Sequence, residues 1–404
     1  MQNVTLQINL APGDYHHAMH LLDHHIEVFE NQTDEILLTF DFNPARLRDV
    51  QKARCESALL YGLIASLQRQ HPSVVLRDVD YNMPVVSAVL GHFFTDRAQL
   101  YDFRGAPIYA YLFGLYSAKN DLVFHIDSDM FFGGFSATWI RDAVDLLQAD
   151  SEIMTVSPLP GPPHPDRILL GQDEYSAYND MAYAFKFSSM STRVFLMDRR
   201  LLAQKLRSSK PPLKGRLLAL YEGFPQSDTL ECIISAAMRS SRKYRVDFLG
   251  TGRGLYSLHP LYRSEAFYRS IPDALRRLKD GDIPDDQLGH YNISDSFLDW
   301  GDAKALYNQG RLRNKLLRRT LASEPEGSKP PRNQSRNNRP RFVPLPLSWS
   351  WLQCRASRLE MRALALTEGT SEAAELLLRL TSAVELRHYP GNVRHLPAFR
   401  FPNF

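Results

Sequence analysis

Short apolar runs alternate with longer amphipathic stretches through the first third of the chain, and this alternation limits the folds open to it. Strands are predicted for "VTLQINL", "EILLTFDF", "SVVLRDVDY" and "DLVFHIDSD". Helices are predicted between them, over about 15–31, 44–70 and 107–118. Strands joined by helical crossovers imply a mostly parallel sheet with helices on both faces, whose ligands sit beyond the carboxyl ends of the strands.

The remaining sequence extends this domain and then changes character. A helix over 138–149, the strand "SEIMTVSPLP" and a strand turning into a helix in "STRVFLMDRRLLAQKL" are predicted, followed by a helix capped by Ser227 or Asp228. The basic segment 321–342 is rich in Pro, Ser, Asn and Arg without periodicity, which predicts a disordered linker. We therefore expect an α/β domain over 1–320 and a small C-terminal helical module over 343–404.

Composition excludes several classes of protein. With 404 residues, 44% hydrophobic, the chain can bury a sizeable core, and its net charge of +3 gives no reason to expect a nucleic-acid partner. No apolar run reaches the roughly 18 to 20 residues that cross a bilayer, and "MQNVTLQINL" lacks a basic region followed by an apolar one, so a cytoplasmic location is expected, with peripheral membrane contact left open. Cys55, Cys232 and Cys354 have no CxxC spacing and are predicted to be buried thiols.

The strand "LVFHI" ends in two aspartates, Asp127 and Asp129, at the edge where such a sheet binds ligands. Residues at i and i+2 of a strand lie on the same face, and a chain that turns at Gly133 and Gly134 can bring the two carboxylates to one point. Mg²⁺ or Mn²⁺ takes oxygen ligands and often shares them with phosphates, so the pair predicts a metal that makes a diphosphate a better leaving group. The competing interpretation is a surface turn.

The order of motifs over about 3–260 resembles the nucleotide-sugar-dependent glycosyltransferases of the GT-A fold, particularly those related to family 2. The matching segments are a first strand "VTLQINL", an acidic residue closing the second strand in "TFDFN", the basic-glycine start of "RGAPIYAYLFGLYSAKN", and "LVFHIDSD". The resemblance implies a Rossmann-like GT-A sheet with a donor half over about 1–135 and an acceptor half over about 136–300.

The resemblance also implies roles for four residues. Asp127 faces the ribose or metal side of the donor, and Asp129 binds a metal that bridges both phosphates. Asp41 accepts hydrogen bonds from the base, and Arg104 approaches the diphosphate. Without the resemblance, Asp41 is a turn residue and Arg104 a solvated loop charge.

The catalytic base implied by the resemblance is Asp228, at the predicted start of a helix. Relatives carry Glu-Asp at this point, whereas this chain has Ser227 before Asp228, and that departure leaves the role open. A helix N-terminus keeps such a carboxylate ionised and ready to accept the proton of a hydroxyl. The alternative is a helix cap without chemistry, and Glu231 is expected to be a residue of the helix face.

Two further residues complete the expected site. His259 follows a strand in "LGTGRGLYSLHP", where some transferases of this fold add a histidine to the metal sphere, which would favour Mn²⁺. Arg253, in "GTGRG", is expected to face phosphate. The histidines of "HHAMHLLDHH" have i, i+4 spacing that can hold zinc, but they fall on the first crossover helix, so a structural role is favoured.

The predicted activity is transfer of a sugar from a UDP- or GDP-sugar to a hydroxyl acceptor with Mn²⁺ or Mg²⁺. No Gln-x-x-Arg-Trp signature is present, so single additions are expected rather than a polymer. The alternatives are a phosphohydrolase with Asp127 as nucleophile and Asp129 as acid, a nucleotidyltransferase, or a degenerate domain that only binds. The donor's base and sugar, the acceptor and the stereochemical outcome are left open.

Overall fold

The structure is a computed structural model that describes residues 3–43, 49–95, 100–102, 106–172, 174–208, 229–305 and 307. All of them belong to one compact unit, Met1–Gln309. The predicted linker, the predicted C-terminal module and Cys354 lie outside the described residues, and those predictions stand as predictions.

One sheet organises this unit, in the order β3-β2-β1-β4-β9-β6-β10-β8-β7. Its strands, in chain order, are β1 Val4–Leu10, β2 Glu35–Phe40, β3 Val74–Asp78, β4 Leu122–Asp127, β6 Ile153–Pro160, β7 Tyr175–Ala177, β8 Ala184–Phe187, β9 Val194–Asp198 and β10 Tyr244–Phe248. Strands β3, β2, β1 and β4 run parallel, β9 is antiparallel to both β4 and β6, and β10 is again parallel to β6. The predicted α/β class with a mostly parallel sheet is confirmed.

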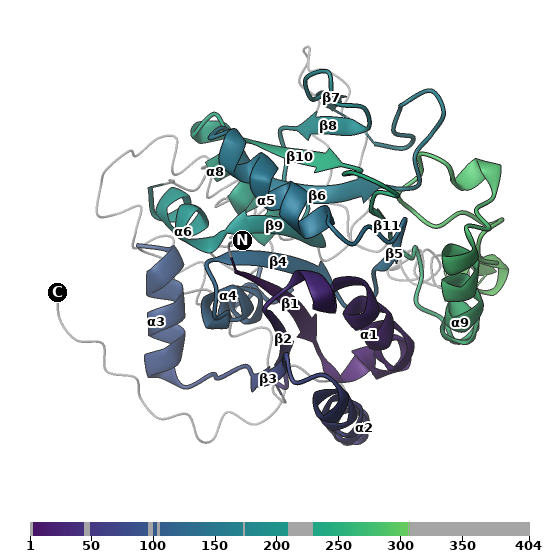
Figure 1. Cartoon of the computed structure of the whole chain (residues 1–404). Helices are drawn as coiled ribbons and strands as arrows, with labels where there is room; N and C mark the ends of the chain where they lie inside the picture. Colours follow the sequence, from purple (N-terminus) through teal and green to yellow (C-terminus); the bar gives the residue numbers. More distant parts are fainter. Residues whose placement is uncertain are drawn as a thin grey trace, which may run out of the picture. The chain divides into compact units, whose positions relative to one another are not determined.

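Helices cover both faces of the sheet, as predicted. One core packs α1 Tyr15–Phe29, α2 Val50–Gln70 and α5 Trp139–Ala149 against alternate residues of the strands. The other packs α3 Met83–Phe93, α4 Tyr109–Ser117, α6 Arg199–Ser208 and α8 Leu230–Ser240 against the intervening residues. Figure 1 shows α1 and α5 in front of the sheet and α4 behind it.

A third core lies beside the carboxyl edge. It joins α9 Glu265–Asp280 to the short strands β5 Phe131–Gly133 and β11 Tyr256–Leu258. Strand β11 is antiparallel to β5 and parallel to β6, so this small ladder attaches the chain after the aspartate pair to the main sheet (Figure 1).

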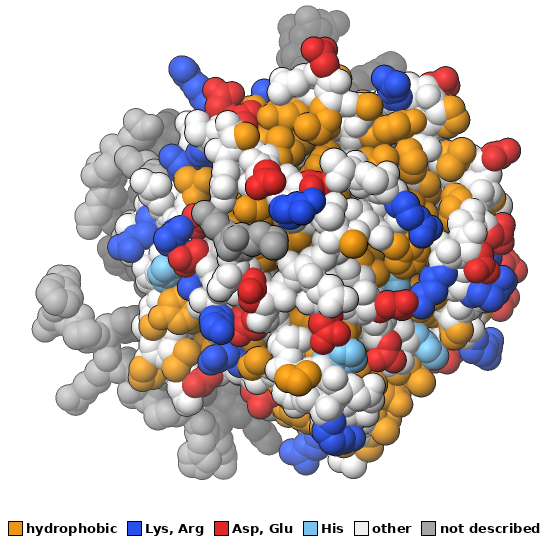
Figure 2. All heavy atoms as spheres, viewed as in Figure 1, with side chains coloured by type: hydrophobic (Ala, Val, Ile, Leu, Met, Phe, Trp, Pro, Cys, Tyr) orange, Lys and Arg blue, Asp and Glu red, His pale blue; other side chains and the backbone are white. Residues whose placement is uncertain are grey.

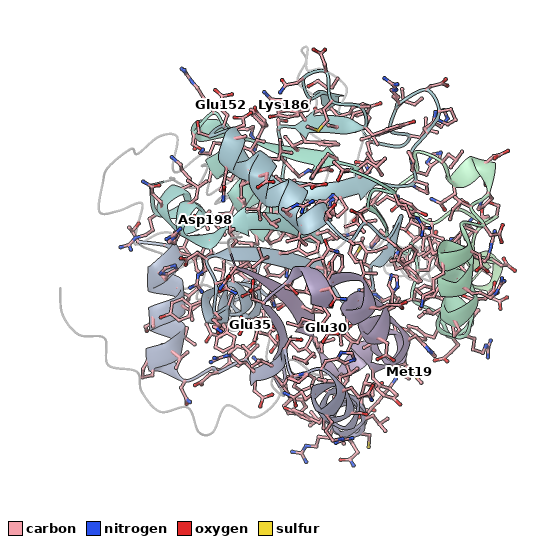
Figure 3. The ribbon with its side chains drawn as sticks, viewed as in Figure 1. Met19, Glu30, Glu35, Glu152, Lys186 and Asp198 are labelled. Carbon is pink, nitrogen blue, oxygen red and sulfur yellow. The ribbon has the colours of Figure 1, made fainter. Side chains whose placement is uncertain are left out.

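The opposite, amino edge of the sheet is closed by polar groups. Glu35 starts β2, and its Oε2 accepts from Thr5 Oγ1 at 2.8 Å and from the backbone N–H of Lys119 at 2.7 Å. Asp198, at the end of the antiparallel β9, pairs in register with Leu122 at the start of β4. The two acids labelled in Figure 3 thus mark the edge away from the expected site.

Several local predictions need correction. Helix α8 is capped by Thr229, whose Oγ1 accepts from the N–H of Cys232 at 3.2 Å, and not by Ser227 or Asp228. Cys55 and Cys232 are exposed rather than buried, because each lies on the outward side of an amphipathic helix. Neither α3 nor α9 was expected.

Among the described residues on the face drawn in Figure 2, charges of neither sign gather into a large patch. Figure 2 shows basic and acidic side chains interspersed over the face that it draws. Among the described helices, none has the length and apolar character that a bilayer crossing demands.

Candidate functional site

A cavity of about 880 Å³ opens at the carboxyl edge of the sheet. The ends of β1, β2, β4 and β6 line one part of it, through Asn9, Asp41, Asp127 and Ser157. The segment 189–194 and the start of α8 line another part. This is the edge at which a parallel α/β sheet is expected to bind its ligand, and the volume is that of a typical small-molecule site.

Asp127 ends β4 and faces this cavity. Its side chain is 33% exposed, and its Oδ1 lies 3.4 Å from Nε2 of the fully buried His125. Burial and the neighbouring Asp129 raise the pKa of Asp127, outweighing the opposite effects of His125 and Arg193. The carboxyl group is therefore available to a ligand while a buried imidazole holds it in place.

A buried polar network continues from His125 below the cavity. Nδ1 of His125 pairs with Oε1 of Gln7, and Nε2 of Gln7 donates to Asn9 at 2.7 Å and to Thr39 at 2.9 Å. Helix α4 passes so close to this network that a Cβ on Gly114 would lie 2.4 Å from Nε2 of Gln7. A larger residue at that point would displace the Gln7 side chain from its hydrogen bonds to Asn9 and Thr39.

Asp129 lies two residues beyond Asp127 but in a different environment. It is 2% exposed, and its Oδ2 accepts from both Nη2 and Nε of Arg263, at 2.6 and 3.0 Å. Burial by itself would raise its pKa, but the guanidinium of Arg263 reverses the effect, so the pKa is lowered and the group is ionised. Arg263 lines the cavity, whereas Asp129 does not.

His259 follows β11 and lies close enough to Asp129 for the two to interact electrostatically. Its Nδ1 pairs with Oδ1 of Asn292 at 3.2 Å, and its ring stacks on Tyr291 with centroids 5.8 Å apart. Burial lowers its pKa to about 4, assisted by Arg193 and Arg263, so the imidazole is neutral at neutral pH.

The side chains of Asp127, Asp129 and His259 are the predicted ligands of a divalent metal ion. Within the part of the chain that the structure describes, no three His, Cys, Asp or Glu side chains form a group that could hold a metal ion. Arg263 binds Oδ2 of Asp129, and only Oδ1 is left without a hydrogen-bond partner among the described residues. At Asp129 the guanidinium of Arg263 therefore occupies the place beside the carboxylate that Mn²⁺ or Mg²⁺ would need, and its positive charge opposes a cation there.

The predicted donor residues divide into two groups. Asp41 follows β2 and lines the cavity, where Tyr81 donates to its Oδ1 at 2.8 Å. Arg253 is exposed and is not among the residues lining the cavity, since its loop packs instead against the start of α5, with Thr251 N–H donating to Asp142 at 3.0 Å. The structure therefore brings Asp41 and Asp127 together and leaves Arg253 apart.

Two predicted residues, Arg104 and Asp228, lie outside the described residues. The residues directly after Asp228, namely Thr229, Leu230 and Glu231, line the cavity. Glu231 was expected to belong to the outer helix face, but it lies at this cavity although it is exposed. The base assignment to Asp228 stays a prediction.

Three buried histidines of α1, His17, His24 and His25, support the turn after Asp127, and we call them the histidine layer. His17 Nε2 pairs with Ser128 Oγ at 2.9 Å, His24 Nε2 accepts from the N–H of Phe132 at 3.2 Å, and His25 Nε2 donates to the carbonyl of Met130 at 2.7 Å. Burial lowers the pKa of His17 to about 3 and of His25 to about 4. The structural role of this cluster is therefore to hold the residues after Asp127 through these three hydrogen bonds.

Sequence reasoning missed several residues of the cavity. Arg245 and Asp247, two apart on β10, form an ion pair with Nε and Oδ1 at 2.8 Å, and both are buried. Arg245 also lies over the ring of Phe187, at 4.1 Å from its centroid. The alternation of charged and apolar residues in "YRVDF" was a usable signal, because it places both charges on one face of the strand.

Arg263 and Asp14 were missed for another reason. Asp14 precedes α1 and lies 3.6 Å from Nη1 of Arg263, and burial raises its pKa to about 6. Arg263 directly precedes Ser264, the N-cap of α9. Nothing in the local sequence around either residue shows that the fold brings them together with Asp129.

Comparison with known proteins yields structural similarity only. No protein-family model matches the chain, and no curated protein matches it. A UDP-glucose pyrophosphorylase complexed with UDP-glucose is 9% identical, with 62% of this chain and 92% of that chain covered and a TM-score of 0.31. An active-site mutant of LgtC is 9% identical, with 71% and 99% covered and a TM-score of 0.33. TarS from S. aureus is 10% identical, with 63% and 60% covered and a TM-score of 0.31. Scores this low carry no argument about activity.

Proposed function

We propose that this chain transfers a sugar from a nucleotide-diphosphate sugar to a hydroxyl acceptor, one sugar at a time. One observation carries the proposal: Asp41 and Asp127 reach the same cavity at the carboxyl edge of the sheet as two arginines, Arg193 and Arg263. Carboxylates suit the hydroxyl and N–H groups of a nucleoside, and guanidinium groups suit its phosphates.

The donor would lie across the ends of β2, β1 and β4. Asp41, held by Tyr81, accepts hydrogen bonds from the base, and Asp127 accepts from the ribose. The cavity volume of about 880 Å³ leaves space for an acceptor beside the donor. In this arrangement the acceptor approaches from the side of Ser189, Arg245 and Asp247.

The reaction forms a bond between the acceptor oxygen and the anomeric carbon of the sugar and breaks the bond from that carbon to the diphosphate. The nucleoside diphosphate leaves with the bonding electrons, and the hydroxyl proton passes to a carboxylate base. We keep Asp228 as the proposed base, because the residues that follow it line the cavity. Positively charged groups near the phosphates stabilise the leaving group.

The phosphohydrolase alternative is less well supported. It needs Asp129 as a general acid that exchanges a proton with substrate. Asp129 is instead buried, ionised and bound on one oxygen by Arg263, and it does not line the cavity. A nucleotidyltransferase would use the same donor residues, and the test below separates it from a sugar transferase by its products.

The test is thermal melting of the full chain with UDP-, GDP- and TDP-sugars and with the free nucleotides, each with and without Mn²⁺, followed by product identification. One nucleotide series should raise the melting temperature of the wild-type chain, because a ligand that binds only the folded state stabilises it. Asp127→Asn should lose the shift and Arg253→Gln should keep it. A chain whose melting is indifferent to every nucleotide would sink the proposal, and release of pyrophosphate rather than a nucleoside diphosphate would favour a nucleotidyltransferase.

A further inference from the structure

Arg263 stands where the sequence predicts a metal ion. Its Nη2 and Nε both donate to Oδ2 of Asp129, at 2.6 and 3.0 Å, and its Nη1 lies 3.6 Å from Asp14. The side chain remains 48% exposed and lines the cavity. Asp129 thus fixes the edge of the guanidinium group that carries Nε and Nη2, Asp14 lies near Nη1, and the group as a whole stays accessible to a ligand.

Asp129 holds the side chain of Arg263 in position. Because it is 2% exposed, its negative charge needs a partner, and Arg263 supplies two charge-assisted hydrogen bonds. A divalent cation placed beside the same carboxylate would be repelled by the guanidinium at close range. The arrangement therefore disfavours a metal at this carboxylate.

The remaining donors of Arg263 suit a phosphate. A guanidinium group has five N–H donors in a rigid plane, and the hydrogen bonds to Asp129 use only those of Nε and one terminal nitrogen. Arg193 lines the same cavity and acts electrostatically on Asp127 and His259. His259 does not add a charge, since it is neutral at neutral pH.

We propose that Arg263, anchored on Asp129, holds the diphosphate of the donor in place of a divalent cation, so that nucleotide binding by this chain is independent of metal. The inference rests on the proposed function, because it concerns the same donor. In this proposal Asp129 is a positioning residue for Arg263, in place of the metal ligand that the sequence predicts. Asp127, whose carboxyl group faces the cavity, is the reason that Mn²⁺ must be included in the test.

The test is isothermal titration of the full chain with UDP and with GDP, first in EDTA and then in Mn²⁺. The wild-type chain should bind one of the two nucleotides in EDTA, with a Kd that Mn²⁺ changes by less than about threefold. Arg263→Gln should weaken binding by at least about tenfold, because a charged bidentate partner of phosphate is lost. Arg253→Gln, which removes an arginine outside the cavity, should bind like the wild type.

A second pair of variants guards against misfolding. Arg263→Gln leaves Asp129 buried and unpaired, so the double variant Arg263→Gln with Asp129→Asn removes both charges and should melt near the wild type while still failing to bind. Arg263→Lys keeps the charge but not the planar donors, and its affinity for the nucleotide should lie between those of the wild type and Arg263→Gln. Equal binding by the double variant and the wild type would overturn the inference.

The outcomes separate this inference from the proposed function. Nucleotide binding that occurs only with Mn²⁺ would overturn the role of Arg263 and leave sugar transfer standing. Binding in EDTA that survives the loss of Arg263 would do the same. Failure to bind any nucleotide in either condition would overturn both.

Discussion

The histidine layer and the cavity lie on two sides of the same turn, and both gather titratable side chains, yet they treat charge in opposite ways. In the histidine layer the imidazoles are buried and neutral, and their hydrogen bonds fix Ser128, Met130 and Phe132. At the cavity, the ionised Arg263 is paired with the buried Asp129 and is itself partly open. Neutral polar groups therefore fix the position of the turn, and charged ones are kept for the ligand.

The comparison predicts that the histidine layer carries stability and that Asp127 carries activity. His25→Ala removes a buried ring and leaves the Met130 carbonyl without its donor, so it should lower the free energy of unfolding by about 3 to 4 kcal/mol. Urea unfolding measures this loss. His20→Ala, on the same helix at a partly exposed position, is the matched control and should change it by less than about 1 kcal/mol. Equal losses of stability in His25→Ala and His20→Ala would show that the histidine layer contributes no more than an exposed position of the same helix.

The same layer predicts the pH dependence of stability. The pKa of His25 is lowered by burial to about 4 in the folded chain, below its ordinary value near 6.5, and the pKa of His24 is also lowered. The unfolded chain therefore binds protons that the folded chain does not, so this stability is complete above pH 6.5 and is lost as the pH falls towards 4. His25 alone should account for up to about 3 kcal/mol.

Unfolding curves from pH 7.5 to 4.5 measure this dependence. The decline in stability should be shallower in His25→Gln, which cannot take up the proton, than in the wild type. Parallel declines in the two proteins would show that His25 is not buried as a neutral ring.

The ion pair of Arg245 and Asp247 tests whether the charged groups at the cavity depend on each other for stability. Burial raises the pKa of Asp247 to about 6 even though Arg245 opposes this effect, which shows how costly the charge is at this position. Asp247→Asn leaves the guanidinium without its charged partner and should cost about 3 to 5 kcal/mol of folding stability. The double variant Arg245→Met with Asp247→Leu should recover most of that loss, as seen in thermal melting, whereas additive losses would mean that the two residues act independently.

The sequence predicted the scaffold better than the site. The apolar runs that became β1, β2 and β4 lie side by side, so Asp41 and Asp127 had to reach the same edge once the sheet was parallel. The N-cap of α8 was harder to predict, because Thr229, rather than Ser227 or Asp228, accepts the hydrogen bond from the N–H of Cys232. Arg263 could not be placed, since its contact with Asp129 spans 134 residues and depends on how β11 and α9 pack beside β5.

The histidines illustrate the same limit. Their i, i+4 spacing in "HHAMHLLDHH" is compatible with a metal site or with a buried face of a helix, and only the position of α1 against the turn decides between the two. The prediction favoured the structural role because of the crossover position. It did not foresee that the partners would be the Ser128 hydroxyl and the backbone of Met130 and Phe132, on either side of Asp129.

The central claim is that the cavity binds a nucleotide sugar through Asp127 and releases a nucleoside diphosphate. The most direct measurement is the rate at which the full chain releases nucleoside diphosphate from UDP-, GDP- and TDP-sugars, in EDTA and again in Mn²⁺, compared between the wild type and Asp127→Asn. We predict release from one donor series, reduced by more than about tenfold in Asp127→Asn, with a melting temperature within about 2 °C of the wild type because Asp127 is partly exposed. No release from any donor, or equal release by the two proteins, would contradict the account.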